Sequence, residues 1–215
     1  MSKPVILDKS HLDAIFALHQ QSIGDEVCAE YVKPEERSFF ERILDGRGLI
    51  MGIFDGPLIA YGVLQTIHSP EENTHEVLGL AADVQIGRLA GAAVATAYRG
   101  QDIHSTLIHA RVQAAAPETL LFSTASPANY PSWGNLLSQH FPIHAIVAKF
   151  GGFTRYLMVH DRKEFDPTKT LAVDSLDVPR QKALIDNGYR GYRAVSEASG
   201  KRAILYAKRI ARWTN

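Results

Sequence analysis

The residues with the greatest potential for chemistry follow an apolar strand in the middle of the chain. Residues 88–94 read RLAGAAV, the next residues form a turn through Arg99 and Gly100, and a helix is predicted over 102–115. A strand that runs through such a turn straight into a helix leaves several backbone amides unpaired at the positive end of the helix dipole. The sequence therefore predicts an anion site at this junction.

Asp102 is the residue of this junction that opposes anion binding. A carboxylate about 5 Å from a phosphate costs roughly 1 to 3 kcal/mol at an effective dielectric constant between 20 and 80. The alternative is that Asp102 caps the helix with its side chain turned to solvent. The roles of two neighbouring side chains have alternatives. Arg99 either contacts the anion or is a solvated turn residue. His104 either contacts a phosphate or faces solvent.

The junction resembles the acyl-CoA pyrophosphate loop of the GNAT acetyltransferase superfamily, in which a strand precedes a segment of the type V-x-P-x-Y-R-G-x-G-x-G/Q. The matching residues are Val94, Tyr98, Arg99 and Gly100. The departures are Thr96 in place of Pro, Asp102 in place of the middle Gly, and His104 in place of Gly or Gln.

Two further segments resemble the same superfamily, in the same order along the chain. Residues 120–135, LLFSTASPANYPSWGN, place Asn129 and Ser132 three residues apart, as in the family segment beside the CoA arm. Residues 150–156, FGGFTRY, look like the Y-G-G-x-x-R-Y block of one branch. The resemblance covers roughly residues 5–162 and extends only loosely over 163–215.

The resemblance implies an acyl-CoA-dependent N-acyltransferase that uses acetyl-CoA, or another acyl-CoA, as co-substrate. The acceptor would be a primary amine of a small molecule or peptide, which attacks the thioester directly. The pyrophosphate would lie on the amides of the turn, and the pantetheine arm would pair with the strand edge at 92–94. The residues expected to bind the co-substrate are Ala92, Val94, Arg99, Gly100, Gln101, Asp102, Ile103, His104, Asn129 and Ser132.

A general base is harder to find in the sequence. The position aligned with the acidic residue of the family's central strand is Ala90, which has no proton chemistry. The substitutes are Asp83, Glu76 and His75, each of which could equally be a solvated loop residue. A water chain that ends at a backbone carbonyl would also serve, because a positioned amine needs only modest help. We take Asp83 as the candidate base.

The proton donor for the leaving thiolate departs from the family pattern as well. Many members of the family use a Tyr seven residues after the matched Asn, where this chain has Leu136. Tyr130 and Ser132 are nearby hydroxyls and are taken as the candidate donors. Tyr156 matches a family tyrosine with a possible structural role, and Asn129 is expected to orient the CoA arm or to cap a helix.

The composition limits the remaining function classes. The 215 residues include 23 Lys+Arg and 23 Asp+Glu, so no overall charge selects nucleic acid or an anionic membrane. The single cysteine, Cys28, cannot form an intrachain disulfide, and no signal peptide or apolar span of about 18 residues is evident. Cytoplasmic residence, as a monomer or homodimer, is the expectation. The nine histidines show no metal-binding spacing, and no nucleotide-binding glycine motif is present.

Periodicity predicts the elements that position these residues. Helices are expected over 10–22, with Ser10 and Asp13 as a capping box, and from Pro34 to just before Gly46. The remaining expected helices are 102–115, 131–140 and 178–187. The expected strands are 48–54, 57–67, 88–94, 119–125, 143–149, 153–160, 189–195 and 201–209, with a hairpin turn at 55–56 and a surface loop over 68–87.

The predicted fold class is α/β, with a mixed, mostly antiparallel sheet, a central splayed parallel pair and flanking helices. Residues 1–162 would form the acyl-CoA-binding domain. Residues 163–215 would form an extension that either lengthens the sheet or covers the acceptor side. Two functional alternatives remain: a GNAT-like CoA-binding or interaction module without turnover, which Ala90, Asp102 and Leu136 favour, and a protein that binds partners through its C-terminal segment.

Overall fold

The computed structural model describes residues 3–24, 30–68, 74–196 and 201–210. The chain forms two compact units, Met1–Ser123 and Thr124–Asn215. A separate domain boundary between residues 162 and 163 stays a prediction. Cys28 lies outside the described residues.

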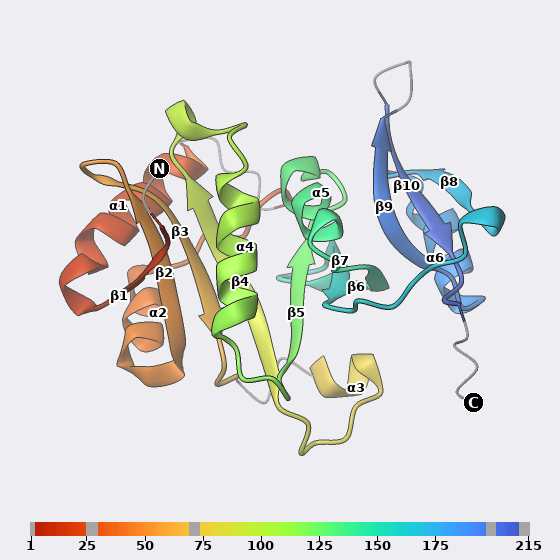
Figure 1. Ribbon diagram of the computed structural model, residues 1–215, viewed down its shortest axis with the longest axis horizontal. Helices are drawn as coiled ribbons and strands as arrows, with labels where there is room; N and C mark the ends of the chain where they lie inside the picture. Colours follow the sequence, from red (N-terminus) through yellow and green to blue (C-terminus); the bar gives the residue numbers. More distant parts are fainter. Residues whose placement is uncertain (1–2, 25–29, 69–73, 197–200, 211–215) are drawn as a thin grey trace. The chain divides into compact units, whose positions relative to one another are not determined.

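The first unit contains a five-stranded sheet in the order in which the strands follow along the chain (Figure 1). The strands are β1 (Val5–Leu7), β2 (Gly48–Phe54), β3 (Leu58–Gln65), β4 (Ile86–Val94) and β5 (Leu120–Ala125). Neighbours are antiparallel except β4 and β5, which are parallel. Gly56 has φ 71° at the predicted hairpin turn, a conformation that glycine adopts without steric cost. The predicted fold class is therefore confirmed for this part of the chain.

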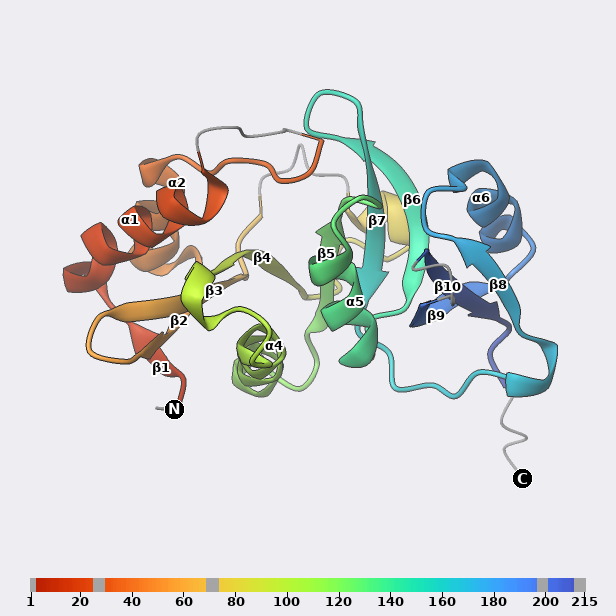
Figure 2. The ribbon, with the colours of Figure 1, turned by 90° about the horizontal axis from the view of Figure 1, so that it is seen from above.

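Helices cover the two faces of this sheet (Figure 2). The helices α1 (Leu12–Ile23) and α2 (Arg37–Arg42), with a π-helical turn at Ile43–Arg47, pack on one face, and α4 (Ile103–Ala114) packs on the other. The first face is an aromatic and aliphatic core around Phe40 and Tyr61. A short helix, α3 (Thr74–Leu78), lies within the predicted surface loop.

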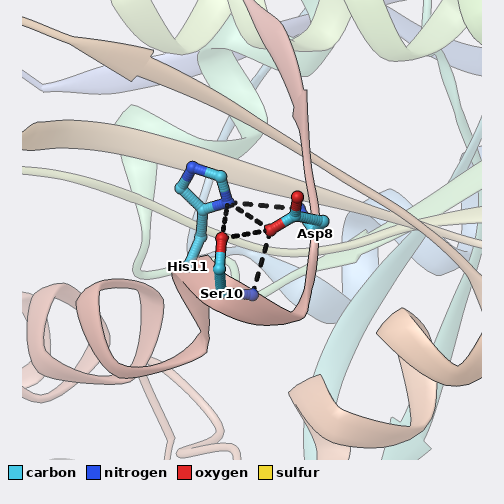
Figure 3. A network of polar contacts seen from close by, with 3 residues as sticks. All are labelled: Asp8, Ser10 and His11. Carbon is cyan, nitrogen blue, oxygen red and sulfur yellow. Dashed lines mark hydrogen bonds and ion pairs between the residues drawn. The ribbon is translucent and has the colours of Figure 1, made fainter.

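The first helix begins differently from its prediction. Asp8, rather than Ser10, is the capping residue, and it starts a 3₁₀ turn at Lys9–His11 that leads into α1. Its carboxylate accepts hydrogen bonds from the Ser10 amide at 2.9 Å and from the Ser10 hydroxyl at 2.5 Å, and it contacts the His11 ring (Figure 3). Asp13 instead accepts a hydrogen bond from Arg37 at 2.6 Å. The predicted Ser10–Asp13 capping box is wrong because Asp8 supplies the acceptor two residues earlier.

The second helix begins three residues later than predicted, at Arg37. Pro34 is not its first residue, and Glu36 takes the cap position with extended backbone angles. The Glu35 amide donates a hydrogen bond to Nε2 of His19 at 3.0 Å. The Glu35 amide is therefore bonded to a side chain of another helix and not to a helix carbonyl. Helix propensity alone does not reveal such a tertiary contact.

The parallel pair separates partway along its length. The pairing of β4 with β5 runs only from Ile86–Leu120 to Arg88–Phe122, although β4 continues to Val94. At the point of separation, the Ser123 hydroxyl donates to the Leu89 carbonyl at 2.7 Å. The six residues of β4 from position 89 to 94 therefore present a backbone edge that β5 does not pair.

The described residues of the second unit form five strands, two α-helices and a 3₁₀ turn at Pro167–Lys169. The strands lie in the order β7, β6, β9, β10, β8. Their bounds are β6 (Ile143–Lys149), β7 (Phe153–Val159), β8 (Leu171–Asp174), β9 (Arg190–Ser196) and β10 (Arg202–Ala207), and the helices are α5 (Tyr130–Ser138) and α6 (Val178–Asp186). The contact of Ile143 with Gly191 joins β6 to β9, so the C-terminal strands lengthen the sheet of this unit.

Candidate active site

The turn between β4 and α4 has the geometry of an anion cradle. A 3₁₀ turn at Thr96–Tyr98 leads to Gly100 with φ 76° and Asp102 with φ 56°, and α4 begins at Ile103. Within the described part of the chain, the amides at positions 100 to 103 donate to no protein acceptor. Four donors thus gather at the positive end of a twelve-residue helix, as the sequence predicts.

The side chains around the turn fix its position. Arg99 donates to the carbonyls of Val94 at 3.2 Å and Ser22 at 3.4 Å, which links the turn to β4 and to the last turn of α1. The Tyr98 hydroxyl donates to Asp55 at 2.8 Å, in the β2–β3 turn. Arg99 is therefore more than a solvated turn residue, because it holds the cradle in place.

Asp102 occupies the cap position of α4, but its side chain makes no cap hydrogen bond. It is exposed and lies in the left-handed region, where the family usually has glycine. The cap position predicted for Asp102 is confirmed. Its negative charge nevertheless remains beside the unpaired amides, while His104 is half-buried in the first turn of α4.

The unpaired edge of β4 carries small side chains. Ala92 is exposed, although it belongs to an inner strand of the sheet. Val94 packs against the core below α4, and Ala90 packs against the core below α1 and α2. An extended ligand can therefore approach the backbone of β4 closely at this place.

A carboxylate that the sequence pattern does not indicate lies beside this strand. The Cγ atom of Glu35 is 4.0 Å from the position that a Cβ atom would take at Gly91 of β4. The Glu35 side chain is 9% exposed and accepts a hydrogen bond from Nζ of Lys33 at 3.0 Å. The position of Glu35 depends on tertiary contacts of the segment before α2. The residues next to it in the sequence therefore give no motif that would identify it.

A buried histidine and tyrosine hold this segment. The Glu35 amide donates to Nε2 of His19, so the ring proton of His19 is on Nδ1, which lies 2.7 Å from the Tyr61 hydroxyl. Burial lowers the pKa of His19, which agrees with a neutral ring. Burial raises the pKa of Tyr61, and the negative charge of Glu35 adds to the rise.

Comparison with known proteins identifies the architecture. No protein-family model matches the sequence, and no curated protein matches it. Among solved structures, the ribosomal-protein-S18-alanine N-acetyltransferase from Escherichia coli has 13% identity and a TM-score of 0.52, over 100% of this chain and 99% of its own. Arabidopsis thaliana NAA60, in complex with a bisubstrate analogue, has 17% identity and a TM-score of 0.57, over 73% of this chain and 95% of its own. The chain has the GNAT fold.

A third solved structure shows how wide the chemistry of the GNAT fold is. The GNAT-like decarboxylase GphF, in complex with isobutyryl-CoA, has 17% identity and a TM-score of 0.55, over 74% of this chain and 98% of its own. Because a fold hosts several reactions, the reaction of this chain has to be argued from its own residues.

The loop residues considered as bases lie toward the other end of β4. Asp83 is exposed and precedes β4, at the end where β4 and β5 are paired. Ala92 is six residues beyond the first residue of β4, which corresponds to about 20 Å along the strand. His75 contacts the Val84 carbonyl at 2.9 Å, and Glu76 is exposed in α3. These three residues lie away from the cradle, and the role of Asp83 as the base stays a prediction.

The remaining candidates lie at the start of α5 in the second unit. Asn129 caps this helix by accepting a hydrogen bond from the Ser132 amide at 3.2 Å, as one of its two predicted roles requires. The Tyr130 ring packs edge-on against Trp133, and the Arg202 guanidinium lies 4.1 Å from its centroid.

Two positions of the second unit serve its core. Tyr156 is fully buried and donates to the Ser175 carbonyl at 2.6 Å, which supports its structural role. Leu136, at the place of the family tyrosine, is a buried core residue. The participation of Asn129, Tyr130 and Ser132 in catalysis or in CoA binding stays a prediction.

A buried arginine lies on the α4 side of β3 and β4. Arg111 is 1% exposed and donates to the carbonyls of Leu107 at 3.0 Å, Val63 at 3.1 Å and Ala90 at 3.5 Å. Burial lowers its pKa to about 9, which leaves it protonated at neutral pH. A Cβ atom at Gly62 would lie 2.9 Å from this guanidinium, so a larger residue there would displace the end of the Arg111 side chain.

Two structural features are absent from the described residues. Among them, no three His, Cys, Asp or Glu side chains are grouped in a way that could hold a metal ion. Over the same ranges, none of the helices combines the length and the apolarity that a bilayer-crossing segment requires.

Proposed function

We propose that this protein is an acyl-CoA-dependent N-acyltransferase that transfers an acetyl group from acetyl-CoA to a primary amine of a small molecule or peptide. The observation that carries the proposal is the row of four unpaired amides at the N-terminus of α4, directly after a strand edge that β5 leaves unpaired. Cytoplasmic residence stays a prediction.

The residues of the first unit fit the co-substrate in two ways. The amides at positions 100 to 103 can donate to a pyrophosphate, whose charge the helix dipole favours. The edge of β4 at 89–94 can pair with the two amides of a pantetheine arm, as an added strand would. An arm that follows β4 backward from the cradle brings its thioester toward Gly91.

The chain then has to position an amine against the thioester carbonyl and to remove its proton. Acetyl-CoA supplies the activated acyl group, and the protein contributes proximity and proton transfer. Arg99 and Tyr98 hold the cradle, and the small residues of β4 let the arm lie against the backbone.

The second candidate function is a CoA-binding module without turnover. Asp102 beside the cradle and Ala90 in place of an acid are the observations that favour it. A carboxylate near the pyrophosphate weakens binding, and the lack of an acid in the central strand removes the base expected there.

Thermal unfolding with acetyl-CoA, followed by thiol release, distinguishes the two functions. At a hundred times its dissociation constant, acetyl-CoA stabilises the folded chain by about 2.7 kcal/mol, which raises Tm by roughly 5–10 °C. Pantetheine, which lacks the pyrophosphate, serves as the control and is expected to give a much smaller shift. If acetyl-CoA gives no shift, the proposed function is wrong. If it gives the shift but a panel of primary amines releases no CoA thiol, the binding module is correct.

A further inference from the structure

We infer that Glu35 is the catalytic carboxylate of this site: it binds the ammonium group of the acceptor and removes its proton, and Lys33 occupies it until the acceptor displaces the lysine. The inference rests on the proposed function and adds to it the residue that recognises the acceptor.

The position of Glu35 is the first argument. Its Cγ atom lies 4.0 Å from the Cβ position of Gly91, within the part of β4 that β5 leaves unpaired. Because residue 91 is glycine, no side chain stands between the carboxylate and the strand backbone. An acyl group held against this edge would meet Glu35 from the α1 and α2 side of the sheet, whereas α4 covers the opposite face.

The second argument is that the backbone that carries the carboxylate is held in place. The backbone of Glu35 is bound to His19, and His19 is bound to Tyr61, which is 0% exposed in the core. A catalytic group whose supporting residues are locked by packing loses little freedom when the substrate binds. His19 and Tyr61 are therefore positioning residues for Glu35.

The ion pair with Lys33 is the third argument. A lysine side chain ends in a primary ammonium with three donors, the same group that an amine acceptor presents at neutral pH. Nζ of Lys33 lies 3.0 Å from Oε2 of Glu35, so this carboxylate already binds one primary ammonium. The Lys33 side chain is 43% exposed, and its ammonium can move to water when an acceptor takes its place.

The reaction that follows is balanced in atoms and charge. Glu35 takes one proton from the ammonium, which gives a neutral amine. The amine lone pair forms the C–N bond at the thioester carbonyl, and the C–S bond breaks with its electron pair on sulfur. The second proton of the nitrogen passes to the thiolate, so the products are the amide and the CoA thiol. Glu35 returns its proton to solvent.

Ammonium binding is tested with n-butylammonium chloride as the probe. In the Lys33→Met variant, where the lysine no longer competes, the probe at ten times its dissociation constant should raise Tm by about 3–6 °C. Tetramethylammonium, which has no N–H donors, should give no such shift. The shift should be lost when Glu35→Gln is added, and it should persist when Glu36→Gln, at the exposed neighbouring carboxylate, is added instead. No probe shift in Lys33→Met, or an equal shift with Glu35→Gln, overturns the proposal.

The same variants separate this inference from the proposed function. Glu35→Gln should keep the acetyl-CoA shift of the wild type, because the cradle is formed by α4 and its preceding turn. With acetyl-CoA and butylamine, mass spectrometry should detect N-butylacetamide, at a rate that Glu35→Gln lowers by about 10²–10⁴-fold. If the wild type binds acetyl-CoA but forms no N-butylacetamide, or if Glu35→Gln retains the full rate, the proton-transfer role is wrong. Loss of the acetyl-CoA shift in the wild type would instead contradict the proposed function and leave ammonium binding standing.

Discussion

The two faces of the β3–β4 pair each hold one charged side chain next to the same stretch of backbone. On the α4 face, the Arg111 guanidinium is enclosed by the carbonyls of Leu107, Val63 and Ala90. On the α1 and α2 face, the Glu35 carboxylate is paired with a lysine whose side chain is 43% exposed. The hydrogen bonds given for Arg111 all go to backbone carbonyls. Glu35 is instead paired with the Lys33 side chain, which a ligand can replace.

This difference separates a structural role from a functional one. Backbone carbonyls of a helix and two strands cannot move away, so Arg111 stabilises the place where the register of β3 and β4 shifts, between Gly62 and Leu64. The Lys33 ammonium reaches solvent, so a ligand with the same chemistry can take its place at the carboxylate. Burial alone would therefore point to the wrong residue of the two.

Removing Arg111 is expected to have the largest effect. Arg111→Ala leaves a cavity and three buried carbonyls that lose their donor, so the free energy of unfolding should fall by about 3–5 kcal/mol. Urea denaturation measures this loss. Gln113→Ala, at an exposed position of the same helix, is the control and should change stability by no more than about 0.5 kcal/mol. A loss below about 1 kcal/mol in Arg111→Ala would contradict the structural role.

A half-buried histidine in the second unit, His144, extends the comparison to a basic side chain that is neutral at pH 7. Burial, with the charges of Arg209 and Arg190, lowers the pKa of His144 to about 4, and Arg209 donates to its Nε2 at 2.9 Å. The unfolded chain binds this proton near pH 6.5, so the contribution to stability is present above that pH and is lost as pH falls toward 4.

The expected loss between pH 7 and pH 5 from this residue is about 2 kcal/mol in the free energy of unfolding. Urea denaturation across this range measures it. His144→Gln keeps an acceptor for Arg209 without the titration, so it should flatten the pH dependence, whereas His109→Gln, at an exposed position, should leave it unchanged. An unchanged slope in His144→Gln would show that the histidine is not the cause.

Sequence reasoning recovered what depends on local chemistry. The hairpin turn at 55–56 and the parallel unit around α4 follow from residue type and periodicity, and the structure confirms them. The strands β1 and β8 were missed, since each has only three or four residues and too short a pattern to detect.

Only the part of the candidate site that consecutive residues form could be predicted from the sequence. The cradle is formed by consecutive residues, so one segment of sequence describes it. Glu35 reaches β4 because its amide bonds to His19, sixteen residues away, and His19 contacts Tyr61, forty-two residues further along. The same tertiary contact moved the start of α2 away from Pro34. A base supplied by such long-range pairing has no sequence signature, whereas Asp83 lies near β4 in the sequence and is therefore the base that the sequence indicates.

Removing the Tyr61 hydroxyl, which contacts the histidine that holds Glu35, should lower stability less than removing Arg111 does. Tyr61→Phe leaves the Nδ1 proton of His19 without its acceptor in the core, which should cost about 1–2 kcal/mol of unfolding free energy. Tyr31→Phe, at an exposed tyrosine, is the control and should cost nothing measurable. The acetyl-CoA shift should persist in Tyr61→Phe while N-butylacetamide formation falls. If both readouts fall together, Tyr61 supports the whole unit and not the carboxylate in particular.

The smallest expected effect concerns Asp102, a charge with no hydrogen bond to the helix that it caps. Because the carboxylate lies beside the amides that would hold a pyrophosphate, Asp102→Asn should tighten acetyl-CoA binding by about fivefold, equivalent to about 1 kcal/mol. Asparagine tolerates the left-handed backbone as aspartate does, so the variant changes the charge and little else. Isothermal titration measures the affinity, and the gain should shrink as salt concentration rises, because the interaction is between exposed charges. If Asp102→Gly tightens binding but Asp102→Asn does not, the close approach of the backbone, and not the charge, limits the cradle.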